Sequence, residues 1–139
     1  MLEPKEQKYR KQQKGRSRNR KKETKGTEIA FGDYGLQALS DDWVNSSQIE
    51  AGRKAITNKL EREGRVWIRI FPDKPVTSLP PEVKMGGGKG EVDRYVFPVK
   101  PGRVLFEVGG VDKELAEEAL NQAGYKMPVK TRFIERGKR

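Results

Sequence analysis

The clearest periodic pattern in the chain lies at residues 47–63, where apolar and small positions recur at the spacing of one face of an α-helix. This stripe consists of Ile49, Gly52, Ile56 and Leu60. Ser47 and Glu50 stand three residues apart in the order of a capping box, in which the serine caps the helix and the glutamate reaches back. Gly64 follows the stripe and suits the left-handed conformation that ends many helices. The pattern therefore predicts a helix from Ser47 to about Glu63.

A second helical stripe follows Asp112, a residue type that caps helix N-termini. Its inner face consists of Leu115, Ala116, Ala119, Leu120 and Ala123. Its outer face carries Glu114, Glu117 and Glu118. Gly124 follows the stripe and is expected to end the helix. Because three carboxylates line the outer face, we expect this helix to face away from any polyanion.

Alternation with a period of two predicts strands in other parts of the chain. The cleanest case is residues 65–71, where Val66, Ile68 and Ile70 alternate with Arg65, Trp67, Arg69 and Phe71. Further strands are expected as two short pieces within 27–39 around a bend at Asp33, then at 93–100 and 102–110 around a tight turn at Pro101-Gly102, and at 129–134. Trp43 and Val44 follow a turn at Asp41-Asp42. Hairpins and a long loop without regular βαβ units indicate an α+β fold, with a mainly antiparallel sheet flanked by two helices.

The outward side of residues 65–71 allows two interpretations. Guanidinium groups beside aromatic rings can clamp phosphates and stack on bases. Aromatic residues of a small sheet also form a second layer of core, with arginine stems lying over them. Both interpretations stay open for Arg65 and Arg69, and we favour a core position for Trp67.

Charge divides the chain into a nearly neutral body with two basic ends, within a net charge of +10. Residues 1–26 hold 11 Lys and Arg against 3 Asp and Glu, and residues 130–139 hold 5 against 1. The residues between them hold 14 against 16. Such basic ends favour binding to a polyanion.

The sequence contains no cysteine and no histidine. Disulfides and thiol catalysis are therefore excluded, and the side chain most used for proton transfer and metal binding is missing. We assign no catalytic residue, no metal site, no cofactor and no small-molecule substrate. No run approaches the length of a transmembrane helix, and no apolar stretch follows Met1, so we expect a soluble intracellular protein with no membrane partner.

The N-terminal extension, residues 1–26, is too polar to fold alone in water. Five of its cations occupy alternate positions: Lys14, Arg16, Arg18, Arg20 and Lys22. In an extended chain these side chains would lie in single file, about 6–7 Å apart. Such a row could follow a phosphate backbone. The simpler alternative is a solvated basic tail.

A loop at residues 72–91 contains the sequence KMGGGKGE, which resembles the glycine-rich loops of nucleotide-binding proteins. Val83 stands where the first glycine of a Walker loop should be, and Gly90 replaces the hydroxyl that binds Mg²⁺. A strand, rather than a helix, is expected to follow. The glycines with Lys84 and Lys89 therefore suit a phosphate of a large molecule or an adaptable contact between RNA helices. An ordinary flexible loop tip is the alternative.

Seven segments of the chain, taken in order, resemble one family. They are KYRKQQKGR, FGDYGLQAL, SSQIEAGRKAI, GRVWIRIFPDKPVT, MGGGKG, VKPGRVLFEVGGV and KMPVKTRF. From about Pro4 to Phe133 the chain is similar to large-subunit ribosomal protein number sixteen of bacteria and organelles. The resemblance implies a structural, non-enzymatic protein of the cytoplasmic or organellar ribosome. It also implies an α+β fold whose basic N-terminal segment and glycine-rich loop reach toward the functional centre.

The resemblance further implies binding to 23S-type rRNA near the A site, late entry into subunit assembly and help in positioning aminoacyl-tRNA. The partners would be that rRNA, the A-site tRNA and neighbouring large-subunit proteins. The resemblance assigns these roles to the residues at matching positions of the extension and the loop. They are Lys8, Arg10, Lys11, Lys14, Arg16, Lys84, Met85, Gly86 and Lys89. The chain departs from the family at Gly87, where a lysine is expected, and at Lys84, where an arginine is common.

The complete set of candidate RNA-binding residues follows from charge, position and resemblance. In the extension they are Lys5, Lys8, Tyr9, Arg10, Lys11, Lys14, Arg16, Arg18, Arg20, Lys21, Lys22 and Lys25. In the body they are Arg65, Arg69, Lys74 and Arg132, and in the loop Lys84, Met85, Gly86, Gly87, Gly88 and Lys89. We expect one α+β domain at 27–134 with a protruding loop at 72–91, followed by a basic C-terminal tail at 135–139.

Two other classes of function remain as alternatives to the ribosomal one. The first is a small phosphate-binding enzyme that uses Lys84 and Lys89. The second is a free-standing nucleic-acid chaperone or regulator that belongs to no fixed assembly.

Overall fold

The computed structural model describes residues 26–77 and 92–137. Predictions that fall on residues 1–25, 78–91 and 138–139 lie outside these ranges. The elements in chain order are β1 (Tyr34–Ala38), β2 (Asp42–Asn45), α1 (Ser46–Leu60), β3 (Arg65–Ile68), β4 (Lys74–Thr77), β5 (Val92–Val99), β6 (Val104–Gly109), α2 (Lys113–Gly124) and β7 (Thr131–Glu135).

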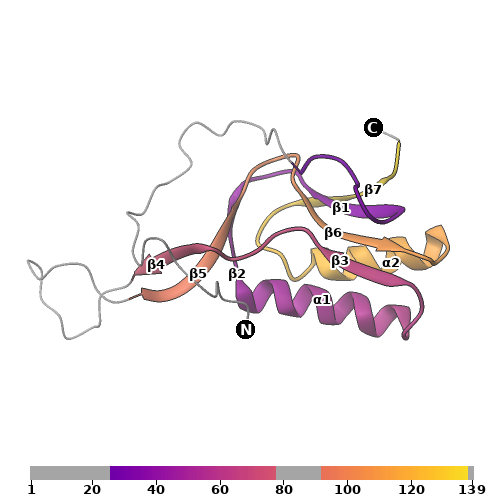
Figure 1. Cartoon of the computed structure of the whole chain (residues 1–139), viewed down its shortest axis with the longest axis horizontal. Helices are drawn as coiled ribbons and strands as arrows, with labels where there is room; N and C mark the ends of the chain where they lie inside the picture. Colours follow the sequence, from indigo (N-terminus) through magenta and orange to yellow (C-terminus); the bar gives the residue numbers. More distant parts are fainter. Residues whose placement is uncertain (1–25, 78–91, 138–139) are drawn as a thin grey trace, which may run out of the picture.

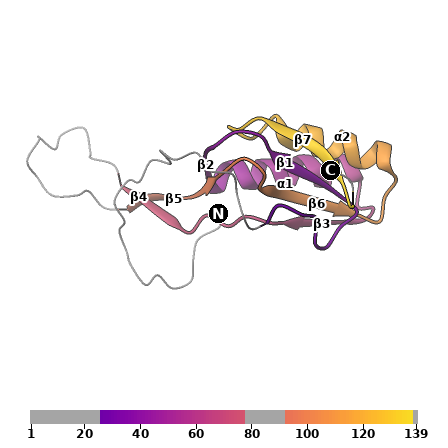
Figure 2. The same cartoon turned by 90° about the horizontal axis from the view of Figure 1, so that it is seen from above.

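The strands form two antiparallel sheets. One has four strands in the order β3-β6-β1-β7, and the other has three in the order β2-β5-β4. The helices α1 and α2 lie side by side on one face of the four-stranded sheet, and the ends of β4 and β5 extend away from them (Figures 1 and 2). This arrangement confirms the α+β class, the antiparallel pairing and the two flanking helices.

The core lies between the two helices and the four-stranded sheet. Its fully buried members include Leu36, Ile49, Ile56, Phe106, Val108, Ala116, Ala119, Leu120 and Ala123. The apolar stripes predicted for both helices are therefore confirmed. Gly52 brings α1 close to the sheet, because a Cβ atom there would lie 2.8 Å from the ring of Phe106.

The first helix begins and ends earlier than its sequence signals indicate. The capping residue is Asn45, whose side chain accepts a hydrogen bond of 2.9 Å from the backbone N–H of Gln48. The side chain of Gln48 in turn accepts from the N–H of Asn45 at 2.9 Å, so a capping box exists two residues before the expected one. At the other end, Glu61 adopts the left-handed conformation with φ 52°. It takes the role that the sequence assigned to Gly64.

The turn at Pro101-Gly102 exists, but the strands on either side of it do not form a hairpin. The N–H of Arg103 donates to the carbonyl of Lys100 at 3.2 Å, and Gly102 has φ 101°. Backbone hydrogen bonds of 2.8 Å then tie Gly102 and Arg103 to Ala38 at the end of β1. The chain consequently passes from β5 in the smaller sheet to β6 in the larger one.

Part of the predicted loop at 72–91 is a strand. β4 pairs with β5 along the edge of the smaller sheet, where Pro75 costs no interior ladder hydrogen bond. The expectation of a loop from residue 72 was wrong for this part, because pairing with β5 overrides the proline signal. The glycine-rich stretch at 84–91 lies outside the described residues.

Replacing the observed helix cap tests the revised start of α1. Asn45→Ala removes the acceptor for the N–H of Gln48, so the free energy of unfolding should fall by about 1 kcal/mol. Asn58→Ala, on the exposed side of the same helix, is the matched control and should change it by less than about 0.5 kcal/mol. Urea denaturation followed by circular dichroism measures both. Equal effects at the two positions would contradict the assigned cap.

Candidate nucleic-acid interface

The four-stranded sheet has a second face that the helices do not cover, and residues 26–33 cross it (Figure 1). We call this the helix-free face. Phe106 and Val108 point to the core, so Glu107 between them points to the helix-free face. Trp67 is paired with Glu107 across β3 and β6 and therefore shares that face.

The crossing segment is held by one buried carboxylate. Glu107 has no exposed surface and accepts hydrogen bonds from the backbone N–H groups of Ala30, Phe31 and Gly32, at 3.1, 2.7 and 2.7 Å. The guanidinium of Arg69 completes the arrangement with an ion pair. A buried charge is tolerated only when it is paired and hydrogen-bonded, and Glu107 meets both conditions.

These hydrogen bonds govern the acidity of Glu107. Burial alone would raise the pKa of its carboxyl group. The N–H groups of Gly32, Ala30 and Phe31, together with the side chain of Arg69, outweigh burial and hold that pKa below its usual range. Glu107 is therefore a carboxylate at neutral pH.

The same contacts explain why the first strand predicted within 27–39 does not form. The N–H groups at residues 30–32 donate to a side chain instead of a neighbouring strand. Gly32 also passes so close to β6 that a Cβ atom there would lie 2.6 Å from the carbonyl oxygen of Val108. Only the second piece, β1, is a strand.

Aromatic and cationic side chains meet above β3. The ring of Phe31 stacks on Trp67 with centroids 6.3 Å apart and planes inclined by 18°. The guanidinium carbon of Arg69 lies 5.3 Å from the centroid of Phe31. Trp67 is half-buried on the helix-free face, outside the main core, so the expected core position holds only in part.

Of the candidate residues in the body, three belong to the helix-free face. Arg65 is exposed at the start of β3, in the same alternation as Trp67. Arg69 has a side chain 17% exposed and is engaged by Glu107 and by the carbonyl of Glu28, at 3.3 Å for the latter. Arg132 is exposed on β7, and its Nε donates to the side-chain oxygen of Gln37 at 2.8 Å.

Lys74, the fourth candidate in the body, lies in the smaller sheet, with its ammonium group 4.6 Å from the ring centroid of Trp43. Partial burial lowers the pKa of Lys74 from its usual value. The structure thus brings Arg65, Arg69 and Arg132 to one face and separates Lys74 from them. The candidates within residues 5–25 and 84–89 lie outside the described residues.

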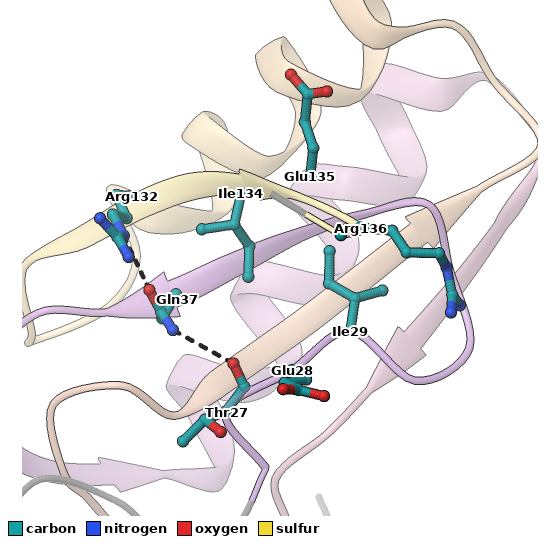
Figure 3. Close-up of a pocket in the computed structure, with 9 residues that line it drawn as sticks. Thr27, Glu28, Ile29, Gln37, Arg132, Ile134, Glu135 and Arg136 are labelled. Atoms are coloured by element: carbon teal, nitrogen blue, oxygen red, sulfur yellow. Dashed lines mark hydrogen bonds between the residues drawn. The ribbon is translucent and has the colours of Figure 1, made fainter. Parts of the chain in front are cut away.

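A pocket of about 590 Å³ opens on the helix-free face between residues 27–29 and β7 (Figure 3). Its lining includes Thr27, Glu28, Ile29, Gln37, Arg132, Ile134 and Arg136. Gln37 joins the two sides, because its amide nitrogen donates to the carbonyls of Gly102 and Thr27 while its oxygen accepts from Arg132. The two arginines of the lining are balanced by two carboxylates, Glu28 and Glu135, so the pocket has no excess of positive charge.

Sequence patterns alone missed four residues of this face. Arg136 extends the alternation of Arg132 by two further steps, and its Nε donates to the carbonyl of Gly32 at 2.9 Å. Arg103 donates to the carbonyl of Arg69 at 3.1 Å and lies 5.0 Å from the ring of Phe97. Phe31 gave no signal. Glu107 did give one, because a lone carboxylate within an apolar strand requires a buried partner.

The N-terminal extension joins the body on this face. The carbonyl of Gly26 accepts a hydrogen bond of 2.7 Å from the N–H of Val104. A Cβ atom at Gly26 would lie 2.7 Å from the guanidinium of Arg103. The opposite side of the molecule carries the exposed carboxylates of α2, Glu114, Glu117 and Glu118. The helix side also carries exposed cations on α1, including Lys54 and Lys59, and Lys59 pairs with Glu118 at 3.0 Å.

Within residues 26–77 and 92–137 no helix is long and apolar enough to cross a membrane. The same residues contain no group of three or more acidic side chains placed to hold a metal ion.

A family model described as Ribosomal protein L16p/L10e matches residues 4–134. The chain belongs to this ribosomal protein family. The match covers the whole span of the predicted resemblance and confirms it. The protein is accordingly a structural component of the large ribosomal subunit, within a ribonucleoprotein that works in translation.

Replacing the buried carboxylate tests what holds residues 26–33. Glu107→Gln leaves Arg69 without its counter-charge, so the free energy of unfolding at pH 7 should fall by about 3 kcal/mol. Glu117→Gln, on the exposed face of α2, is the control and should stay within about 0.5 kcal/mol of the wild type. Urea denaturation at neutral pH measures both.

The difference in the free energy of unfolding between wild type and Glu107→Gln should depend on pH, because the pKa of Glu107 is low. The carboxylate contributes stability in full above the unfolded-state pKa of about 4.3, and the contribution is lost as pH falls through the lower folded-state pKa. The difference in the free energy of unfolding between the two proteins should therefore become smaller on acidification below about pH 4. A difference in the free energy of unfolding that stays constant down to about pH 2.5 would contradict the role assigned to the Glu107 carboxylate.

Proposed function

We propose that this protein binds 23S-type rRNA near the A site, helps to position aminoacyl-tRNA and completes late assembly of the large subunit. The observation that carries the proposal is the family match over residues 4–134, which includes most of the basic extension. The proposed location at the A site and the proposed contact with tRNA both rest on the sequence resemblance. Charge and geometry support the manner of binding.

We further propose a division of labour along the chain. Residues 1–26 are the basic extension, 27–134 form the single rRNA-binding domain, and 135–139 are a basic tail. Two contacts of the described residues support this division: the carbonyl of Gly26 accepts from the N–H of Val104 in β6, and Arg136 donates to the carbonyl of Gly32 in the crossing segment.

Binding in this proposal rests on neutralisation of phosphates. Cations of the extension follow the RNA backbone, and each contact releases condensed counterions, so affinity falls with rising salt. Arg65, Arg132 and Arg136 add cations from the domain, while the carboxylates of α2 turn away from the RNA. The buried Glu107 adds little repulsion, because Arg69 and three N–H groups neutralise it.

The salt dependence of rRNA binding tests the role of the extension. Deleting residues 1–25 removes 11 cations and 3 anions but keeps Gly26, which is bonded to β6. If the five alternating cations each neutralise one phosphate, the slope of log K against log salt should fall by about 4. Filter binding of full-length and shortened protein to purified large-subunit rRNA over a salt series measures the slope.

A charge control separates position from net charge in that experiment. Lys54→Gln with Lys59→Gln removes two cations from the outer side of α1 and should leave the slope nearly unchanged. An unchanged slope after deletion of residues 1–25 would refute the role of the extension. Absence of any rRNA binding by the full-length protein would refute the proposed function itself.

The orientation on the ribosome is tested by a density map of the assembled large subunit. The helix-free face, with Arg65, Arg132 and Arg136, should lie against rRNA near the A site. The exposed side of α2, with Glu114, Glu117 and Glu118, should face solvent or a basic neighbouring protein. The reverse orientation would contradict the proposal.

A further inference from the structure

We infer that Phe31 is a stacking platform for one unpaired base of the RNA. The inference rests on the proposed function and adds to it a specific contact that is not made to phosphate. It starts from the exposure of this side chain. Phe31 is 60% exposed on the helix-free face, although a phenylalanine has no polar tip that gains from water.

The position of the ring is fixed from two directions. Glu107 holds the N–H groups of residues 30, 31 and 32, so the backbone on both sides of the ring is tied to β6. Trp67 stacks beneath the ring, and Arg69 lies 5.3 Å from its centroid. Trp67 lies in β3 and Arg69 directly follows that strand, so both contacts of the ring come from the sheet, while 60% of the side chain stays exposed. A ring held in this way loses little entropy when a partner binds.

The charges around the ring favour a nucleotide over an apolar protein partner. Arg69 lies against the ring, and Arg65 stands exposed two positions before Trp67 on the same side of β3. A base has a π-face for Phe31, and the phosphates on either side of it have guanidinium groups within the same face. An apolar protein surface would satisfy the ring but would also bury the charge of Arg65, which is exposed in this structure.

A base stacked on an aromatic side chain contributes to affinity without any charge of its own. Loss of the ring should therefore weaken RNA binding by about 5- to 150-fold while leaving the salt slope unaltered. This combination distinguishes Phe31 from the cations of the extension, whose loss alters the slope.

The experiment compares Phe31→Leu with the wild type as full-length proteins. Filter binding to large-subunit rRNA over a salt series should show weaker binding of the variant at every salt concentration, with an equal slope. Binding to a short oligouridine should also weaken, whereas binding to inorganic polyphosphate, which has no bases, should not. Phe31→Tyr keeps a ring and should restore the affinity.

Tyr125→Leu is the matched control. Tyr125 is 79% exposed at the end of α2, on the helix side of the sheet, so its loss should leave RNA affinity unchanged. Urea denaturation verifies that each variant folds. If Phe31→Leu does not fold, Phe31→Met, which is apolar and has no ring, takes its place.

Each result supports or overturns the inference. Equal affinity of wild type and Phe31→Leu for rRNA overturns stacking but leaves the proposed function intact, and would point to a protein partner over the ring. A loss of affinity with a changed slope, or an equal loss for polyphosphate, also overturns it. If the wild type does not bind rRNA at all, the proposed function and the stacking inference both fall.

Discussion

The helix-free face depends on the hydrogen bonding of a single buried carboxylate. Glu107 collects three backbone N–H groups and one guanidinium in a place where water does not reach it. These donors lie on the crossing segment and on Arg69, which directly follows β3, so one side chain joins β6 to both pieces of chain. Without it, Arg69 would be left without its counter-charge and residues 30–32 without acceptors. The position of Phe31 and the entry of the extension at Gly26 both follow from this arrangement.

The two sides of this small domain expose different sets of side chains. The helices bury their apolar stripes against the sheet and turn carboxylates outward on α2, while arginines gather on the face that the helices leave open. In a ribonucleoprotein, the exposed arginines attract a polyanion to the helix-free face, whereas cations and carboxylates on the helices partly offset one another. The chain's near-neutral body and basic ends are the sequence counterpart of the same property.

Helix formation and membership of a ribosomal family could be derived from the sequence, because both depend on residues close together in the chain or on characteristic segments. The stripes of α1 and α2 and the cap at Asp112 came out as expected. The cap at Asn45 was missed, since asparagine and serine both suit that position and only the backbone conformation decides between them. Arg65 and Arg132 were candidates by charge, and the structure places both on the helix-free face, together with Arg136 of the predicted basic tail.

What the sequence determined by itself is therefore the local chemistry: two amphipathic helices, alternating strands, basic ends and a chain without histidine or cysteine. Tertiary structure alone decided how distant pieces meet. In the tertiary structure, the turn at Gly102 leads from β5 in the smaller sheet to β6 in the larger one. Residues 30–32, for which a strand was predicted, donate to Glu107 instead. Arg69 forms an ion pair with Glu107. The physical reason is that pairing partners separated by tens of residues compete for the same backbone and side-chain groups. Only the complete fold fixes which partner each of them receives.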